Sequence, residues 1–159
     1  MSALRRFSSP SALFDAAFAT GTLTTIATGG ALLGLGWREG EAGRVFRLAG
    51  RALLERLGFA SAAAPLSSVA LGYLHHLTIA TVWGVVLALF VLPWRGVARV
   101  LVTVGVAAGY VLLVTTVVPA PLRIGYGVTG NLSAAVPIGA ALAVALLGGA
   151  WLSQGEPDR

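Results

Sequence analysis

Four long apolar segments limit what this chain can fold into. They cover approximately residues 11–37, 66–92, 97–118 and 132–152. Each is long enough for a helix that crosses a bilayer, which takes about 20 residues. The strict alternation of a transmembrane β-barrel strand is absent from them. Because the bilayer interior offers no hydrogen bonds to the backbone, we predict an all-α polytopic membrane protein with four transmembrane helices, forming a single membrane domain over residues 1–159.

The composition excludes the other broad classes of protein. Hydrophobic residues make up 57% of the chain and charged residues 11%, with a mean hydropathy of +0.85. Ordinary soluble domains contain about 45–50% apolar and about 25% charged residues. A soluble globular domain and a disordered chain are therefore excluded. The absence of cysteine excludes a disulfide scaffold.

The positive charge is distributed in a way that indicates a membrane and not a nucleic acid. The net charge of +5 comes from arginine, because the chain has no lysine. We assign the arginines, with Arg95 and Arg99 among them, to the connections that flank the apolar segments, which is typical of membrane proteins. A nucleic-acid-binding protein would carry a basic face instead, so we predict the lipid bilayer as a partner and no nucleic acid.

The composition and the charges together predict where the protein is located. An arginine-only chain rich in alanine, glycine, valine and leucine is typical of a GC-rich bacterial genome. We therefore predict a multi-pass protein of the bacterial inner (cytoplasmic) membrane. The arginines divide almost evenly between the two sides. The doubly basic Arg5-Arg6 start and the tight Trp94-Arg95 turn favour termini in the cytoplasm.

A polar segment separates the first two spans, and we predict an amphipathic helix over approximately residues 42–60. Its charged face consists of Arg44, Arg47, Arg51 and Glu55, and its apolar face of Phe46, Leu53 and Leu57. The spacing of three and four residues places each set on one side of a helix. Two compatible interpretations follow. The helix lies in the membrane interface with its arginines toward water, or it packs on the bundle as a lid.

Small residues in the first and fourth spans predict close helix contacts. Gly30 and Gly34 form a G-x-x-x-G pattern in the first span. Threonines in the same span either serve packing, with hydroxyls bonded to their own turn or across to a partner helix, which we favour, or line a substrate path through Thr20, Thr24 and Thr28. The third connection, residues 118–131, is rich in glycine and proline, and we expect an extended or partly re-entrant loop there.

Ionisable groups inside a membrane are costly and therefore informative. His75 and His76 lie roughly 15 Å along the second span, near the level of Thr25 and Tyr110 when residues are counted at 1.5 Å each. The candidate polar intramembrane site consists of His75, His76, Tyr110, Thr25, Thr78 and Asp15. Two roles are open for the histidines: neutral groups that hydrogen-bond inside the bundle, or a proton relay or ligand site.

The sequence predicts neither an enzyme nor a cofactor. A nucleophile constellation and a P-loop are both missing, and a dinucleotide fingerprint is missing too. Two adjacent histidines on one helix cannot hold a haem iron from both sides, so only a single ligand or a partner's histidine would remain. Zinc needs three or four convergent ligands, which so few carboxylates and no cysteine do not supply. We therefore predict no catalytic residues, no metal and no cofactor.

A short set of motifs resembles a known kind of protein. The stretch Gly72-Tyr73-Leu74-His75-His76, followed by Trp83-Gly84 and preceded by a Thr/Gly-rich first helix, is similar to small four-helix bacterial inner-membrane proteins of unknown function. The similarity covers approximately residues 11–150. It implies the four-helix fold and transfers no activity.

From these observations we predict an integral membrane protein without a catalytic site. It would serve as an accessory or structural subunit of a membrane complex, with protein partners or as a homo-oligomer. The alternative is a small oligomeric transporter or permeability protein that uses His75 and His76 in the middle of the membrane.

Overall fold

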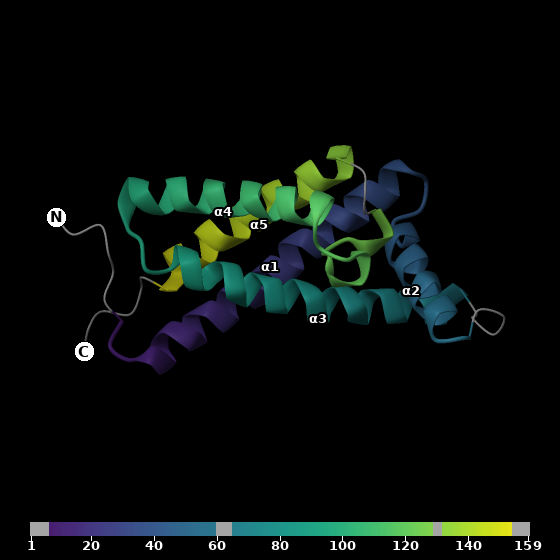
Figure 1. Ribbon diagram of the computed structural model, residues 1–159, viewed down its shortest axis with the longest axis horizontal. Helices are drawn as coiled ribbons and strands as arrows, with labels where there is room; N and C mark the ends of the chain where they lie inside the picture. Colours follow the sequence, from purple (N-terminus) through teal and green to yellow (C-terminus); the bar gives the residue numbers. More distant parts are fainter. Residues whose placement is uncertain (1–6, 60–64, 129–131, 154–159) are drawn as a thin grey trace.

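A computed structural model describes residues 7–59, 65–128 and 132–153, and these residues fold into helices without a β-strand (Figure 1). The long helices are α1 (Pro10–Arg38), α3 (Pro65–Val91), α4 (Gly96–Thr116) and α5 (Leu132–Leu152). All four are long and apolar enough to cross a membrane, which confirms the predicted fold class. The chain is thus consistent with a multi-pass integral membrane protein.

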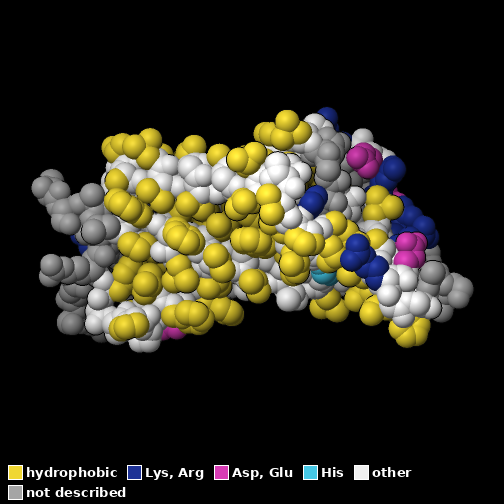
Figure 2. Space-filling view, in the orientation of Figure 1, with side chains coloured by type: hydrophobic (Ala, Val, Ile, Leu, Met, Phe, Trp, Pro, Cys, Tyr) yellow, Lys and Arg dark blue, Asp and Glu magenta, His cyan; other side chains and the backbone are white. Residues whose placement is uncertain are grey.

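Shorter elements gather at one end of the bundle. They are α2 (Arg44–Arg56) and two single turns of 3-10 helix, η1 (Ala120–Leu122) and η2 (Tyr126–Val128). Helix α1 begins and α5 ends at the opposite end of the bundle (Figure 1). Figure 2 shows apolar side chains over most of the visible surface and charged side chains gathered at the α2 end.

The start of α1 follows from two neighbouring residues. The Ser9 side chain accepts a hydrogen bond of 3.1 Å from the backbone N–H of Ala12. Pro10, which has no N–H to satisfy, is the first helical residue. A serine cap followed by proline is a strong helix start.

Helix α1 is the centre of the bundle, because it packs against both α3 and α5. Its buried face carries Thr20, Thr24 and Thr28, none of which is exposed. Each of these hydroxyls donates to the carbonyl four residues earlier, at 2.7, 3.0 and 2.7 Å. This is the packing arrangement that we favoured, in which a buried hydroxyl is satisfied by its own helix.

Glycines mark the places where the long helices meet most closely. A Cβ on Gly84 of α3 would come within 2.7 Å of the Gly21 Cα of α1. A Cβ on Gly149 of α5 would overlap the Thr20 side chain. Gly30 and Gly34, which we expected at such a contact, instead face outward, where a Cβ would meet no part of the described chain within 4 Å. The close contacts of α1 therefore use a different set of small residues from the one its G-x-x-x-G pattern suggested.

Helix α2 lies on the bundle with its buried face against α3. That face consists of Val45, Phe46, Ala49 and Gly50. A Cβ on Gly50 would overlap the carbonyl of Ser68, and one on Gly72 would overlap the carbonyl of Phe46. Backbone therefore touches backbone at this crossing, as the lid interpretation requires. The helix ends at Arg56, before the predicted end at residue 60, which lies outside the described residues.

This crossing gives a first prediction. The change Gly72→Ala should lower the free energy of unfolding by about 1–3 kcal/mol, because the new methyl group meets rigid backbone of α2. The matched control is Gly148→Ala in α5, where a Cβ has nothing within 4 Å. It should change stability by less than about 0.5 kcal/mol. Titration of the protein in mixed micelles with a denaturing detergent measures both, and equal effects would contradict the close crossing.

Candidate functional site

The two histidines face different neighbours, as two adjacent positions on a helix must. The Nε2 atom of His76 lies 3.1 Å from the carbonyl oxygen of Thr25 in α1. The Nε2 atom of His75 lies 2.6 Å from the carbonyl oxygen of Pro121 in the α4–α5 connection. A carbonyl oxygen can only accept, so each imidazole carries its proton on Nε2 and donates it. The histidines thus join α3 to α1 on one side and to the connection on the other.

Aromatic rings hold both imidazoles in place. Phe46 of α2 contacts the His76 ring edge-on, with ring centroids 5.6 Å apart. The Tyr126 ring lies at the same centroid distance from His75. Gly29 leaves room for the buried His76 ring, since a Cβ there would come within 3.2 Å of Nε2. Both histidines therefore lie at the level of α2 and η2, at the end of the bundle where charged side chains gather.

One atom of this pair has spare hydrogen-bonding capacity. The Nδ1 atom of His76 is buried and has no hydrogen-bond partner among the described residues. An unpaired buried polar atom costs about 1–3 kcal/mol. Because Nε2 already donates, Nδ1 is left as an acceptor that could take a proton or bind a donor.

A second cluster forms around Tyr110 of α4. Its hydroxyl accepts a hydrogen bond of 2.9 Å from the backbone N–H of Ile124. The ring of Trp83 meets the Tyr110 ring edge-on at 5.2 Å, and the indole N–H donates to the carbonyl of Leu122 at 2.7 Å. From the sequence, Trp83 was part of the motifs that resemble small four-helix membrane proteins, but it was not predicted as a site residue. The available signal was its position, since the other three tryptophans, Trp37, Trp94 and Trp151, lie at span ends.

Together these clusters hold residues 117–128, which follow α4 and include η1 and η2, against the bundle. Arg123 adds to them by donating through Nε to the carbonyl of Val118, beyond the last turn of α4. Gly125 adopts a φ of 74°, and a Cβ there would come within 2.8 Å of Ile138. The connection therefore folds onto the helices.

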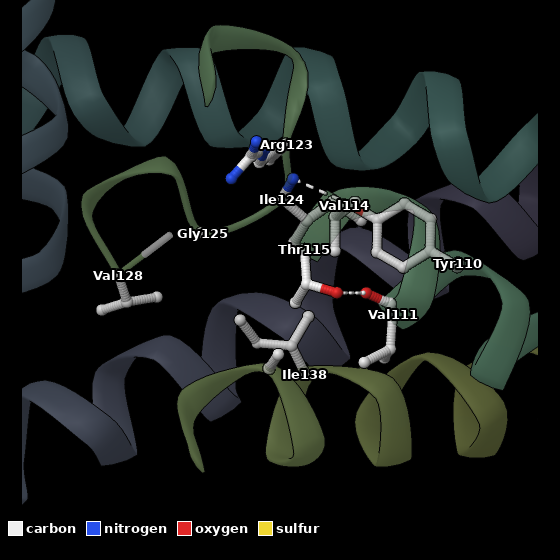
Figure 3. A pocket seen from close by; sticks show the side chains of 10 residues that line it. Tyr110, Val111, Val114, Thr115, Arg123, Ile124, Gly125, Val128 and Ile138 are labelled. Carbon is white, nitrogen blue, oxygen red and sulfur yellow. Dashed lines mark hydrogen bonds between the residues drawn. The ribbon is translucent and has the colours of Figure 1, made fainter. Parts of the chain in front are cut away.

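A small cavity remains between α4, this connection and α5 (Figure 3). Its volume is about 20 Å³. Tyr110, Thr115, Arg123 and Ile138 are among the side chains around it. The Thr115 hydroxyl is already bonded to the carbonyl of Val111 at 2.9 Å. Such a cavity holds roughly one water molecule, whereas small-molecule sites occupy about 300–1,000 Å³.

The predicted site residues are only partly brought together. Thr25 lies beside His76, and its hydroxyl bonds to the Gly21 carbonyl and to the Thr81 hydroxyl. Tyr110 is linked to His75 only through the α4–α5 connection. The exposed hydroxyl of Thr78 bonds back to the Leu74 carbonyl of its own helix. Asp15 is exposed on α1.

Arg99 differs from what the sequence suggested. It lies within α4 and is buried, not part of an exposed connection. Its guanidinium donates to the carbonyl of Trp94 at 2.6 Å and to that of Ala150 at 3.1 Å. Because Ala150 belongs to the last turn of α5, the positive charge meets the negative end of that helix dipole. Arg99 thus ties α4 to α5.

Comparisons of the chain with protein-family models, with curated proteins and with solved structures give no match. Within residues 7–59, 65–128 and 132–153, no three His, Cys, Asp or Glu side chains are grouped to hold a metal ion.

The Tyr110 cluster gives a second prediction. The change Tyr110→Phe should destabilise the protein by about 1–2 kcal/mol, because the buried N–H of Ile124 loses its acceptor. Tyr73→Phe removes the same hydroxyl group from a residue that is 47% exposed. Its free energy of unfolding should stay within about 0.5 kcal/mol of the parent's. Unfolding in mixed micelles measures both variants. A Tyr110→Phe protein as stable as Tyr73→Phe would show that this hydrogen bond does not hold the connection.

Proposed function

We propose that this protein is a non-catalytic integral membrane protein that acts as an accessory or structural subunit of a membrane complex. Our proposal places it in a bacterial inner membrane with both termini in the cytoplasm. The use of its interior polar groups supports a structural role. His75, Trp83 and Tyr110 each bond to backbone of the α4–α5 connection. These bonds hold the fold together, as expected of a structural role.

The observation that carries the proposal is a pair of uncovered glycine faces. A Cβ at Gly30 or Gly34 on α1, or at Gly105 or Gly109 on α4, would have no atom of the described residues within 4 Å. Elsewhere this chain uses glycine where backbones touch, as at Gly21. A G-x-x-x-G face lets a second membrane helix approach closely. These two faces fit the helix of a partner subunit or of a second copy of the chain.

A third prediction tests this association. The double change Gly105→Ile and Gly109→Ile should reduce partner recovery or self-association at least about tenfold, since it removes about 1.4 kcal/mol or more of helix contact. Purification from native membranes in mild detergent, with mass spectrometry and cross-linking, measures this loss. Gly30→Ile with Gly34→Ile tests the α1 face in the same way.

The control for both doubles is Gly148→Ile, another open glycine that has Leu152, and not a small residue, four positions later. It should leave association unchanged. A monomeric parent protein without partners, or doubles that associate as well as this control, would contradict the proposal.

The second candidate is a small oligomeric transporter or permeability protein that uses His75 and His76. The unpaired buried Nδ1 of His76 is the observation that favours it. A fourth prediction follows for this candidate. In vesicles that trap a pH-sensitive dye, His76→Ala should abolish a proton flux that the parent protein supports, while the helical circular dichroism is retained. A flux that does not change in His76→Ala, or a parent protein without flux, would exclude this candidate.

A further inference from the structure

The α2 end of the bundle carries more positive than negative charge. Residues 38–59 together with the α4–α5 connection contain six arginines and three glutamates. Two of these arginines are neutralised by salt bridges. Arg44 lies 3.3 Å from Glu39, and Arg47 binds both carboxylate oxygens of Glu41. The excess positive charge at this end must therefore come from the remaining arginines.

Three exposed arginines have no carboxylate partner within the part of the chain that the structure describes. They are Arg38 at the end of α1, and Arg51 and Arg56 on α2. The Arg56 guanidinium rests over the ring of Tyr126, 5.8 Å from its centroid. This contact positions Arg56 without cancelling its charge.

Large apolar side chains are exposed next to these arginines in the sequence. Trp37 precedes Arg38 and is 76% exposed, while Leu57 follows Arg56 and is 64% exposed. Phe59 is 58% exposed nearby in sequence. Exposed cationic and large apolar side chains at neighbouring positions of the chain match the boundary between phosphate headgroups and acyl chains, where tryptophan gathers and arginine reaches the phosphates. Water or an acidic protein would interact favourably with the arginines but not with the exposed apolar side chains.

We propose that Arg38, Arg51 and Arg56 bind the phosphates of anionic phospholipids, such as phosphatidylglycerol, in the leaflet at the α2 end. The planar guanidinium group makes paired hydrogen bonds to phosphate oxygens. Trp37, Leu57 and Phe59 contact the upper acyl chains beneath those headgroups. Helix α2 contributes its outer face to this surface, since its inner face is occupied by α3.

The test measures lipid preference directly. The full chain is reconstituted in vesicles of equal parts phosphatidylglycerol and phosphatidylcholine, and spin-labelled lipids report the relative association of each. The parent protein should prefer phosphatidylglycerol. The triple change Arg38→Gln, Arg51→Gln and Arg56→Gln should reduce that preference by at least about fivefold, the factor expected from even one arginine at an anionic surface.

Two control variants separate this site from a general charge effect. Neutralising the two ion pairs together, with Glu39→Gln, Glu41→Gln, Arg44→Gln and Arg47→Gln, leaves the net charge unchanged and should leave the preference unchanged. Replacing Arg38, Arg51 and Arg56 by lysine retains the charge and should retain most of the preference. The parent's preference should also weaken as salt is raised, because exposed charges are screened.

Three outcomes would overturn the proposal. In the first, the glutamine triple variant keeps the parent's preference for phosphatidylglycerol. In the second, the parent's preference does not depend on salt. In the third, glycerol 1-phosphate in solution abolishes the parent's preference. The last result would indicate a site for a free phosphate and not for a lipid surface. The salt and competition measurements use the parent protein, so they decide the matter even where the triple variant does not fold.

Discussion

Backbone outside a helix must find its hydrogen-bond partners within the protein when it lies among apolar helices. In this chain the constraint falls on the connection between α4 and α5. Side chains of α3 and α4 supply the hydrogen-bond partners that this connection needs. His75 and Trp83 donate to carbonyls of the connection, and Tyr110 accepts from the Ile124 N–H. These residues would be unexplained polar groups if the connection were a free loop. With the connection folded onto α3 and α4, their positions along the helices have a physical reason.

Close glycine contacts bring the remaining elements to the same place. The crossing of α2 and α3 at Gly50 and Gly72 carries Phe46 onto the His76 ring. It also lays α2 beside η2, where a Cβ on Gly127 would overlap the carbonyl of Val45. One end of the bundle is thereby closed by α2 and the connection together. The outer surface of this end carries the unpaired arginines, and glycine faces remain uncovered on the long helices.

Local features of the fold could be predicted from the sequence. The four spans, the Ser9-Pro10 helix start and the helix after α1 each follow from runs of apolar residues, capping or spacing over a few residues. The faces of the helices could not be predicted in this way. Gly29 is buried against His76 whereas Gly30 is exposed, although they are neighbours. Which of them lies in a contact depends on where α3 and α5 pack.

The candidate site could likewise be predicted from the sequence only in part. Counting residues along antiparallel helices placed Thr25 near His76, and the structure joins them. Counting could not assign Trp83 or Arg99, because the distant partners that they bind, Leu122 and Ala150, are backbone carbonyls, and any residue supplies a carbonyl. The histidines likewise pair with carbonyls and not with the side chains of Thr78 or Tyr110.

Hydrogen exchange at the α4–α5 connection tests the central claim most directly. Amide exchange of residues 119–128 is followed with the protein in lipid nanodiscs. The account predicts that the Ile124 amide, bonded to the Tyr110 hydroxyl, exchanges at least about 100-fold more slowly than in an unstructured peptide, which corresponds to about 2.7 kcal/mol of protection. Exchange at the rate of an unstructured peptide would contradict it, because the connection would then not be held against the bundle.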